Sequence, residues 1–377
     1  MSPEALSPRT ASYPQKPVDV AAIEQELTQL WRHPQVVTGT KEPLVRACMS
    51  NLVVFCSAQD QANVVMGEIA SIVVQHPSRV LLLVGDANLQ TPLVEAYVSA
   101  HYHLFGEGEQ QVYSEHVTIN AGGRATRLLP SAVRSLLIGD LPTALWWATP
   151  QAPPLGGELF QELRAMADQV IYDSLGWPDA VHSVVATANW VMGERSGQVV
   201  SDLAWRRLKP WRRLIGQSLD PAVIPGALES VSEVVVEHGP HALPQAWLLI
   251  GWLACRLGWR PAGGKMAPGV EVTWGFQSPH GPLHVTIRRL SEGEPEVRST
   301  SITWNTGGRP VTIRFAVIGP GRLGVMLEGS PAPLRVLAAP QQPRASLVAR
   351  QLPDLGRDTL FRDTLGVART MAEALLR

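Results

Sequence analysis

The sequence predicts an α/β N-terminal domain with a parallel or mixed sheet, then a helical middle segment, then an α+β C-terminal domain with an antiparallel meander and a closing helix. Three observations predict this order. A strand–helix–strand pattern ends in the all-apolar run Val80–Val84, which is typical of a strand buried on both faces. The segment Gln245–Leu257 is apolar around almost the whole circumference of a helix. From Val270 onward, apolar residues alternate with polar ones, which is the period of a strand with one buried face.

These patterns divide the chain into four segments. Residues 1–17 hold four prolines among serines and threonines, which predicts a disordered tail. We expect the α/β domain over 18–178, the helical segment over 179–260 and the antiparallel domain over 261–377.

The first helix of the α/β domain is predicted over Val20–Trp31, because its apolar residues recur at i, i+4, i+7 and i+8 and Asp19 can serve as its N-cap. Further helices are expected at Asp60–Val74, Arg127–Ile138 and Glu158–Ala167. The expected strands are a continuous one from about Val45 to Phe55, Val80–Val84, Leu93–His103, Gln111–Ile119, Thr143–Trp147 and a last one at Val170–Tyr172.

The middle segment is expected to hold three helices, at Ala180–Met192, Asp202–Leu219 and Gln245–Leu257. Pro210 should interrupt the second helix, because proline disfavours α conformation at the residue before it. In the C-terminal domain we expect strands around 270–276, 283–287, 311–317 and 323–327, a proline-rich loop over 330–345 and a closing helix at Asp358–Leu376.

Composition excludes several classes of protein. The chain of 377 residues carries 32 basic and 33 acidic side chains, so nothing in its charge favours nucleic acid as a partner. The longest apolar stretch, near Ala246–Cys255, is about half of the roughly 20 residues that a membrane-spanning helix needs. The N-terminus lacks the apolar region of a signal peptide. We therefore expect a cytoplasmic protein that has no membrane contact.

The three cysteines, Cys48, Cys56 and Cys255, include no C-x-x-C pair. On one continuous strand Cys48 and Cys56 would lie about 26 Å apart, too far for a disulfide. Cys255 falls in the most apolar helix and is expected to behave as a small core residue.

Motifs that would indicate catalysis are largely missing. Gly319–Gly324 matches G-x-G-x-x-G, but alternating strands precede and follow it, so it is predicted to be a hairpin turn. The strand–helix junction at Phe55–Asp60 contains no glycine, which argues against a nicotinamide cofactor. No P-loop, G-x-S-x-G elbow or H-E-x-x-H occurs. We expect no catalytic residues and no cofactor.

Histidines offer one alternative. His101 and His103 share a face of one predicted strand and His116 lies on the next, so the three could hold a metal ion. The competing interpretation is a polar strand face in water. Because no carboxylate or cysteine joins them at a recognisable spacing, we expect no metal site.

The segment Asp202–Arg213 is the most unusual in the chain, with five basic residues in eight positions. Its apolar residues share one helical face, and Arg206, Lys209 and Arg213 share another. Two interpretations follow: a basic surface for an acidic partner or a phosphorylated ligand, or a solvated face on a core helix.

Three tryptophan-rich segments carry a family resemblance: LPTALWW at 141–147, DLAWRRLKPWR at 202–212 and AWLLIGWLACRLGW at 246–259. They resemble the OpcA family, the glucose-6-phosphate dehydrogenase assembly proteins, from about residue 20 to the C-terminus. The resemblance implies a cyanobacterial-type or actinobacterial regulator of the oxidative pentose phosphate pathway, without catalytic activity. Such a protein binds the dehydrogenase, favours its active oligomer and activates it allosterically, and in cyanobacteria thioredoxin-linked control implies thioredoxin as a further partner.

Two alternatives to this allosteric partner stay open, a sugar-phosphate enzyme that uses the arginine-rich segment 206–213 as a phosphate clamp, and a scaffold with no effect on turnover. The residues expected to bind the partner are Arg206, Arg207, Lys209, Arg212, Arg213, Trp146 and Trp147.

Overall fold

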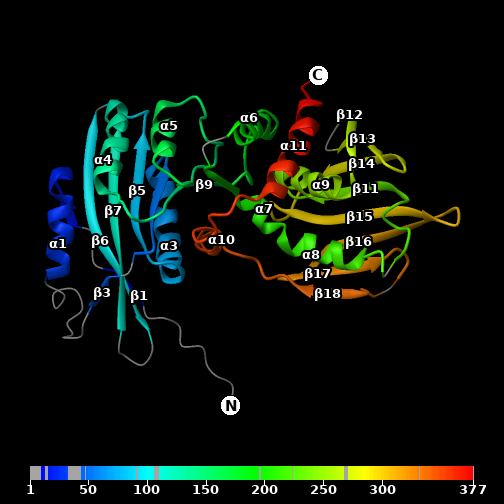
Figure 1. Ribbon diagram of the computed structural model, residues 1–377, viewed down its shortest axis with the longest axis horizontal. Coiled ribbons are helices and arrows are strands. Elements are labelled where there is room, and N and C mark those ends of the chain that lie inside the picture. Colours follow the sequence, from blue (N-terminus) through cyan, green and yellow to red (C-terminus); the bar gives the residue numbers. More distant parts are fainter. Residues whose placement is uncertain are drawn as a thin grey trace, which may run out of the picture.

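Two large β-sheets, each packed against helices, lie side by side in the computed structural model of the chain (Figure 1). The structure describes residues 10–12, 16–32, 44–46, 48–90, 92–105, 110–194, 197–222, 224–266, 271–330 and 332–376. Most of the segment predicted as a tail, 1–17, lies outside these ranges, as does Val270.

The N-terminal sheet is mostly parallel. Its strands follow the order β1-β6-β7-β5-β4-β8-β9-β10, with β2 also paired to β6 and β3 to β7. The strands are β1 (Thr10–Ser12), β2 (Lys16–Val18), β3 (Leu44–Arg46), β4 (Ser50–Cys56), β5 (Ser78–Asp86), β6 (Leu93–Phe105), β7 (Gln110–Gly122), β8 (Thr143–Trp147), β9 (Gln169–Tyr172) and β10 (Val199–Asp202).

Six of these strands run parallel in the order β7-β5-β4-β8-β9-β10. Numbered along the chain, that order is 3-2-1-4-5-6, the arrangement of a doubly wound sheet whose topological switch point lies between its first and fourth strands. Here the switch point lies between β4 and β8. Such sheets bind their ligands beyond the carboxyl ends of the strands, which makes that edge a place to search for a site.

Helices cover both faces of this sheet, as the all-apolar strands predicted. Helices α3 (Gln59–Gln75) and α10 (Arg344–Gln351) pack on one face against Val54, Leu82 and Trp146. Of the described helices, four cover the other face: α1 (Ile23–Arg32), α4 (Leu129–Leu136), α5 (Glu158–Ala165) and α6 (Ala180–Gly193). Two short helices precede the first two of these, η1 (Val20–Ala22) before α1 and η2 (Gly123–Leu128) before α4.

Two N-terminal elements differ from the prediction. The strand expected from about Val45 to Phe55 is two strands: β3 pairs with β7, whereas β4 lies at the centre of the sheet between β5 and β8. The strand is therefore interrupted between Arg46 and Ser50, and Cys48 lies outside both β3 and β4. Residues 10–12, 16 and 17, expected in a disordered tail, belong to β1 and β2, which pair antiparallel with β6.

The C-terminal sheet has the order β12-β13-β14-β11-β15-β16-β17-β18 and is antiparallel except where β11 pairs with β14. The prediction of an antiparallel meander is thus correct for most of the sheet. Its strands are β11 (Val231–His238), β12 (Arg260–Met266), β13 (Glu271–Ser278), β14 (Gly281–Arg289), β15 (Val297–Thr306), β16 (Arg309–Gly319), β17 (Arg322–Leu327) and β18 (Arg335–Ala338).

Helices α8 (Lys209–Ser218), α9 (Leu243–Leu257) and α11 (Thr359–Glu373) cover one face of the C-terminal sheet. The core between them includes Trp247 and Trp274, whose rings meet edge to face with centroids 6.4 Å apart. The indole of Trp274 also donates a hydrogen bond to the carbonyl oxygen of Met371 at the end of α11. The closing helix is thereby fixed onto the sheet.

The middle segment 179–260 is less purely helical than predicted. Besides α6, α8, α9 and the short helix α7 (Leu203–Arg207), it holds β10 and β11. Strand β10 extends the N-terminal sheet and β11 lies at the centre of the C-terminal sheet, so the segment contributes to both. The valines at 234–236 were the available signal for β11.

One further prediction is confirmed, and several elements were not predicted. The interruption expected at Pro210 is confirmed: α7 ends before Leu208 and α8 begins at Lys209. Strands β12, β15 and β18 and helix α10 were not predicted, and β18 and the start of α10 fall in the segment expected to be a loop, 330–345. Over the described residues, every helix is too short or too polar to cross a bilayer.

Candidate functional site

A groove with a volume of about 920 Å³ lies between helices α7 and α8, the β16–β17 turn and the segment 339–343. Arg207, Pro210 and Trp211 line it from the helices, and Gly319–Gly321 lines it from the turn. Residues 294–296, Arg298 and the segment 339–343 complete the walls. The groove thus brings together three features that the sequence analysis treated separately: the arginine-rich segment, the G-x-G-x-x-G motif and the proline-rich stretch.

The G-x-G-x-x-G motif is a hairpin turn, as predicted. Strand β16 ends at Gly319 and β17 begins at Arg322. Gly321 has a φ of +64°, a left-handed conformation that a residue with a side chain adopts only at an energetic cost. The glycines therefore serve the turn, and Arg322, which the sequence analysis did not single out, is exposed at its end.

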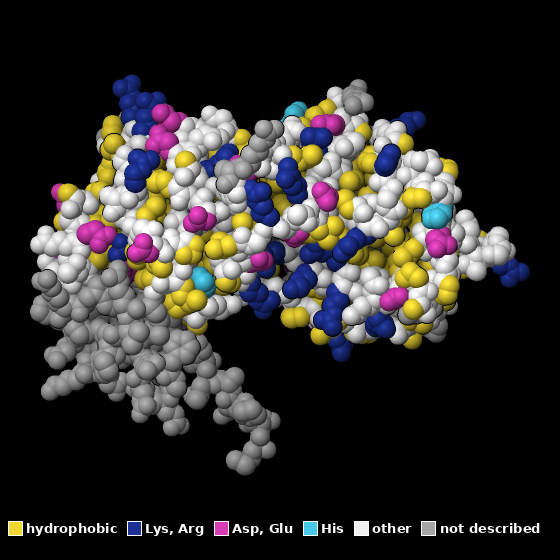
Figure 2. Space-filling model, in the orientation of Figure 1, with side chains coloured by type: hydrophobic (Ala, Val, Ile, Leu, Met, Phe, Trp, Pro, Cys, Tyr) yellow, Lys and Arg dark blue, Asp and Glu magenta, His cyan; other side chains and the backbone are white. Residues whose placement is uncertain are grey.

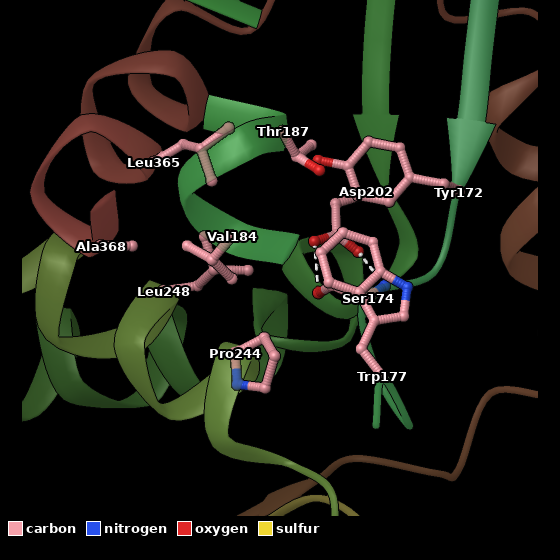
Figure 3. A pocket seen from close by; sticks show the side chains of 10 residues that line it. All are labelled: Tyr172, Ser174, Trp177, Val184, Thr187, Asp202, Pro244, Leu248, Leu365 and Ala368. Carbon is pink, nitrogen blue, oxygen red and sulfur yellow. Dashed lines mark hydrogen bonds between the residues drawn. The ribbon is translucent and has the colours of Figure 1, made fainter. Parts of the chain in front are cut away.

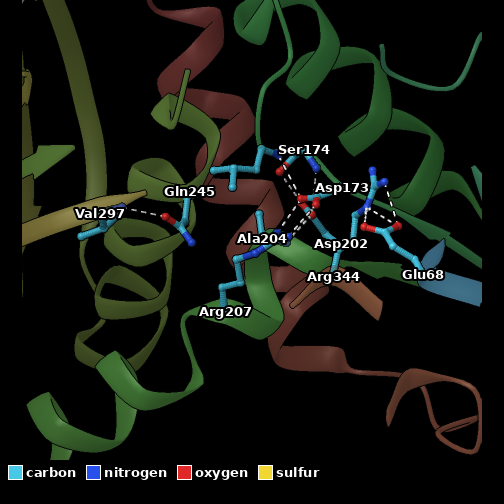
Figure 4. Close-up of polar contacts among 10 residues, drawn as sticks. Glu68, Asp173, Ser174, Asp202, Ala204, Arg207, Gln245, Val297 and Arg344 are labelled. Carbon is cyan, nitrogen blue, oxygen red and sulfur yellow. Dashed lines mark hydrogen bonds and ion pairs between the residues drawn. The ribbon is translucent and has the colours of Figure 1, made fainter. Parts of the chain in front are cut away.

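Arg207 is held in place by an ion pair (Figure 4). Its guanidinium donates two hydrogen bonds to the carboxylate of Asp173, at 2.7 and 2.8 Å. Because Asp173 follows β9 and Arg207 ends α7, the pair ties the carboxyl end of the N-terminal sheet to the wall of the groove. A planar two-point contact of this kind fixes orientation as well as distance.

Asp202 forms a second buried connection beside this pair (Figure 4). Its carboxylate accepts hydrogen bonds from the Ser174 amide at 3.0 Å, the Ser174 hydroxyl at 2.5 Å and the Ala204 amide at 2.8 Å. Burial, and secondarily the charge of Asp173, raise the pKa of Asp202 from 3.8 to about 7. As the N-cap of α7, Asp202 fixes where the arginine-rich segment begins.

A small cavity of about 10 Å³ adjoins Asp202 (Figure 3). It is lined by Tyr172 and Thr187, whose hydroxyl groups find no hydrogen-bond partner among the described residues. A space of this size holds about one water molecule, and two hydroxyls and a carboxyl group suffice to bind it. The cavity is too small for any substrate.

The five basic residues predicted to bind a partner divide into two sets. Arg206 contacts Gln351 and forms an ion pair with Asp354 at 2.7 Å, and Arg207 is bound to Asp173. Arg212 lies over the ring of Trp205, with its guanidinium carbon 3.4 Å from the ring centroid. Burial lowers the pKa of Arg212 to about 10.

Only Lys209 and Arg213 of the five are exposed, and neither forms an ion pair within the part of the chain that the structure describes. Ala204, Leu208, Trp211 and Ile215 form the buried face of the segment, as predicted.

Trp146 and Trp147 are buried. Trp146 has an exposed fraction of 0% and lies beneath the guanidinium of Arg344, which also forms an ion pair with Glu68 at 2.9 Å (Figure 4). Trp147 has an exposed fraction of 4% and stacks on Phe55, with ring centroids 4.2 Å apart. Neither indole reaches the surface, so in this structure neither provides a contact for a partner.

The carboxyl edge of the N-terminal sheet lacks the features of a dinucleotide site. Near the switch point, the rings of Phe55 and Trp147 stack on each other in the core, on the face of the sheet that α5 covers. In the turn that follows β4, the amide and hydroxyl of Ser57 both bind the side-chain oxygen of Gln61. With no glycine there, the backbone cannot approach a pyrophosphate as it does in dinucleotide-binding sheets.

None of the three cysteines, all of which lie within the described residues, forms a disulfide in the structure. Burial raises the pKa of the Cys56 thiol to about 12, and burial also raises the pKa of Cys255. Thiols with such pKa values form little thiolate, the reactive species, at neutral pH. The expected distance between Cys48 and Cys56 rested on one continuous strand, which the structure does not contain.

The histidine cluster lies partly outside the described side chains, since His101 and His103 are described only as backbone of β6. Within the described side chains, no three histidine, cysteine, aspartate or glutamate residues gather closely enough to hold a metal ion. His116 is buried on β7 beside Thr118.

Comparison with known families matches most of the chain. The family OpcA_G6PD_assem, described as the N-terminal domain of a glucose-6-phosphate dehydrogenase subunit, matches residues 69–189. The family OpcA_G6PD_C, described as the C-terminal domain of the same kind of protein, matches residues 198–365.

Curated relatives carry the name OxPP cycle protein OpcA. The protein of Nostoc punctiforme is 26% identical over 78% of this chain and 65% of its own length. That of Synechocystis is 25% identical over 79% of this chain and 64% of its own length. The chain therefore spans about two thirds of the length of these relatives.

Solved structures with a similar course of the chain share little sequence with it. An oxidoreductase from Sinorhizobium meliloti is 12% identical, with a TM-score of 0.48 over 87% of this chain and 97% of its own. A super-repressor mutant of Gal80p from Saccharomyces cerevisiae is 7% identical, with a TM-score of 0.47 over 89% of this chain and 97% of its own.

Proposed function

Because the chain belongs to the OpcA family of glucose-6-phosphate dehydrogenase subunits, we propose that it is a non-catalytic partner of that dehydrogenase in the oxidative pentose phosphate pathway. In this proposal the chain binds the dehydrogenase, promotes its active oligomer and activates it allosterically. The observation that carries the proposal is the match of both family domains, over 69–189 and 198–365.

The arrangement of the N-terminal sheet supports a role without catalysis. A doubly wound sheet with this strand order is the framework on which many dehydrogenases bind their nicotinamide cofactor. In this chain the turn that follows β4 contains no glycine, and the amide and hydroxyl of Ser57 bind the side chain of Gln61. The chain thus has the strand order of a dinucleotide-binding sheet without the glycine-rich turn that approaches the pyrophosphate.

Activation requires only that the chain prefer the active state of the dehydrogenase over the inactive one. A tenfold shift of that equilibrium corresponds to about 1.4 kcal/mol of preference. A few well-placed contacts suffice for this, and no chemical step by the chain is needed.

Thioredoxin is not part of the proposal. A thiol switch needs an accessible thiolate, and burial disfavours one at two of the three cysteines, because it raises the pKa of Cys56 to about 12 and also raises that of Cys255.

The test is to add the purified chain to purified dehydrogenase and to follow NADPH formation together with the sedimentation of the complex. We expect no NADPH from the chain alone, a faster-sedimenting dehydrogenase in its presence and a higher rate at low glucose 6-phosphate. Turnover of a sugar phosphate by the chain alone would instead support the enzyme alternative. Binding with an unchanged rate would support the scaffold alternative.

A further inference from the structure

The exposed basic residues around the groove have no internal role. Lys209 and Arg213 on α8, Arg322 on β17 and Arg335 on β18 are all exposed. Among the residues that the structure describes, none of the four forms an ion pair or a side-chain hydrogen bond. Figure 2 shows basic side chains gathered over α8 and strands β17 and β18. Their charge is therefore available to another molecule.

The neighbouring arginines make the contrast clear. Arg206, Arg207 and Arg344 are each neutralised by a carboxylate at 2.7 to 2.9 Å, and Arg298 lies 3.5 Å from Glu296. In this part of the molecule, arginines that stabilise the fold have acidic partners close by. The four exposed ones lack such partners, which leaves an uncompensated positive surface beside the groove.

Apolar side chains are exposed at the same place. Ile318 lines the groove and is 39% exposed, and Leu334 and Val336, on or next to the edge strand β18, are 63% and 46% exposed. Large apolar side chains that gather on a surface mark an interaction site more often than isolated ones do. Strand β18 is also an edge strand, paired only with β17 in the described sheet.

The floor of the groove is rigid. Pro210, Pro320 and Pro340 have fixed φ angles, and the indole of Trp211 is packed into the core with an exposed fraction of 6%. A preformed surface loses little conformational entropy when it binds a partner. An extended occupant is favoured because the edge strand β18 beside the groove can pair with an extended segment through its backbone.

We propose that this groove binds an extended, acidic segment of the dehydrogenase that carries at least one large apolar side chain. This rests on the proposed function and adds the docking site to it. The acidic side chains pair with Lys209, Arg213 and Arg322, and the apolar side chain packs beside Ile318. Exposed Glu294 at the other wall repels acidic side chains of the bound segment. The acidic residues of that segment therefore lie toward α8 and β17.

The experiment measures binding of the full chain to purified dehydrogenase by titration calorimetry at low and at high salt. The test variant is Lys209→Glu, Arg213→Glu, Arg322→Glu. The control is Arg124→Glu, Arg127→Glu, Arg309→Glu, which makes the same change of charge at exposed positions without ion pairs among the described residues and away from the groove.

We expect the test variant to bind at least about tenfold more weakly and the control to stay within about twofold of wild type, since like charges across an interface oppose binding. The wild-type complex should weaken as salt is raised, and the test variant should lose most of that salt dependence. Both variants should unfold at the wild-type temperature. If the test variant is destabilised, the milder Lys209→Gln, Arg213→Gln, Arg322→Gln variant takes its place, with an intermediate loss expected.

Two results would count against different claims. Wild-type binding by the test variant, or an equal loss in the control, would show that the groove is not the docking site. A wild-type chain that binds no dehydrogenase at all would instead overturn the proposed function.

Discussion

The two sheets differ in how many faces of each strand are buried. In β5, the consecutive residues Leu81, Leu82 and Leu83 all have an exposed fraction of 0%, because helices cover both faces of the N-terminal sheet. In β14, Leu283 and Val285 are buried, whereas His284 between them is exposed. Helices cover only one face of the C-terminal sheet, so its strands alternate. The comparison shows that the number of covered faces, rather than strand propensity, sets the sequence of each strand.

Charge is distributed in the same way. On the open face of the C-terminal sheet, a ladder of ion pairs crosses the strands from β13 to β16: Glu271 on β13 binds Arg288 on β14, and Glu237 on β11 binds both Arg288 and, across β15, Arg314 on β16. The three arginine–glutamate contacts are 2.9, 3.4 and 2.8 Å, and both arginines are nearly half exposed. By contrast, Asp202 lies buried at the carboxyl end of β10, and Asp173, which follows β9, is half-buried and pairs with Arg207.

The largest expected effect on stability comes from placing a lysine at each of two adjacent residues of one strand, in β5 and in β14. Leu82→Lys and Leu83→Lys should both prevent folding at room temperature, since each buries an unpaired ammonium and costs more than about 4 kcal/mol. In the C-terminal sheet Val285→Lys should do the same, whereas His284→Lys should stay within about 0.5 kcal/mol of wild type. Urea unfolding followed by circular dichroism measures all four. Tolerance of either lysine in β5 would show that one face of that sheet is open.

A smaller difference is expected between buried and exposed ion pairs. Asp173→Ala leaves Arg207 largely buried without its partner and should cost about 2–4 kcal/mol of unfolding free energy. Arg314→Ala removes one member of the exposed ladder and should cost less than about 1 kcal/mol. Thermal unfolding of the two variants beside wild type gives the comparison. Equal costs would mean that the Asp173–Arg207 pair does not hold α7 to the N-terminal sheet.

The smallest effect is a dependence on pH. Burial raises the pKa of Asp202 to about 7, above its ordinary value of 3.8, so the folded protein keeps a proton that the unfolded chain has released. Its contribution to stability is therefore greatest below about pH 4 and declines as the pH rises to about 7.

The matching variant is Asp202→Asn, which keeps an N-cap side chain but cannot ionise. Its unfolding midpoint relative to wild type should rise between about pH 5 and about pH 8. A flat difference for Asp202→Asn would mean that Asp202 is ionised throughout this range.

Local patterns predicted much of the fold. The apolar run at Val80–Val84 and the alternation from Leu283 to Ile287 identified the two kinds of strand, and Pro210 identified the break between α7 and α8. These signals are local. Whether one or two faces of a strand are buried shows in the alternation of neighbouring residues, and proline, which lacks an amide hydrogen, affects only the few residues around it. Strand β10 was missed because it is only four residues long and leads directly into a helix.

The candidate site was predictable only in part. The sequence indicated that Trp211 packs inward and that the segment around it is basic, and both are correct. It could not separate Arg207 from Arg213, because the partner of Arg207 is Asp173, 34 residues earlier. It gave Trp146 and Trp147 as surface candidates, although the sheet buries both.

Local sequence patterns were sufficient to predict the classes of the two sheets, the hairpin at Gly319–Gly324, the inward face of the arginine-rich segment and the resemblance to its family. Which basic side chains are neutralised depends on the tertiary fold, as does the position of that hairpin opposite α8 in the groove. The two kinds of information act over different distances along the chain. Backbone propensity and periodicity act between neighbours in the chain, whereas an ion pair or a groove requires residues that the chain brings together from distant positions, as it does with Trp211 and Pro320.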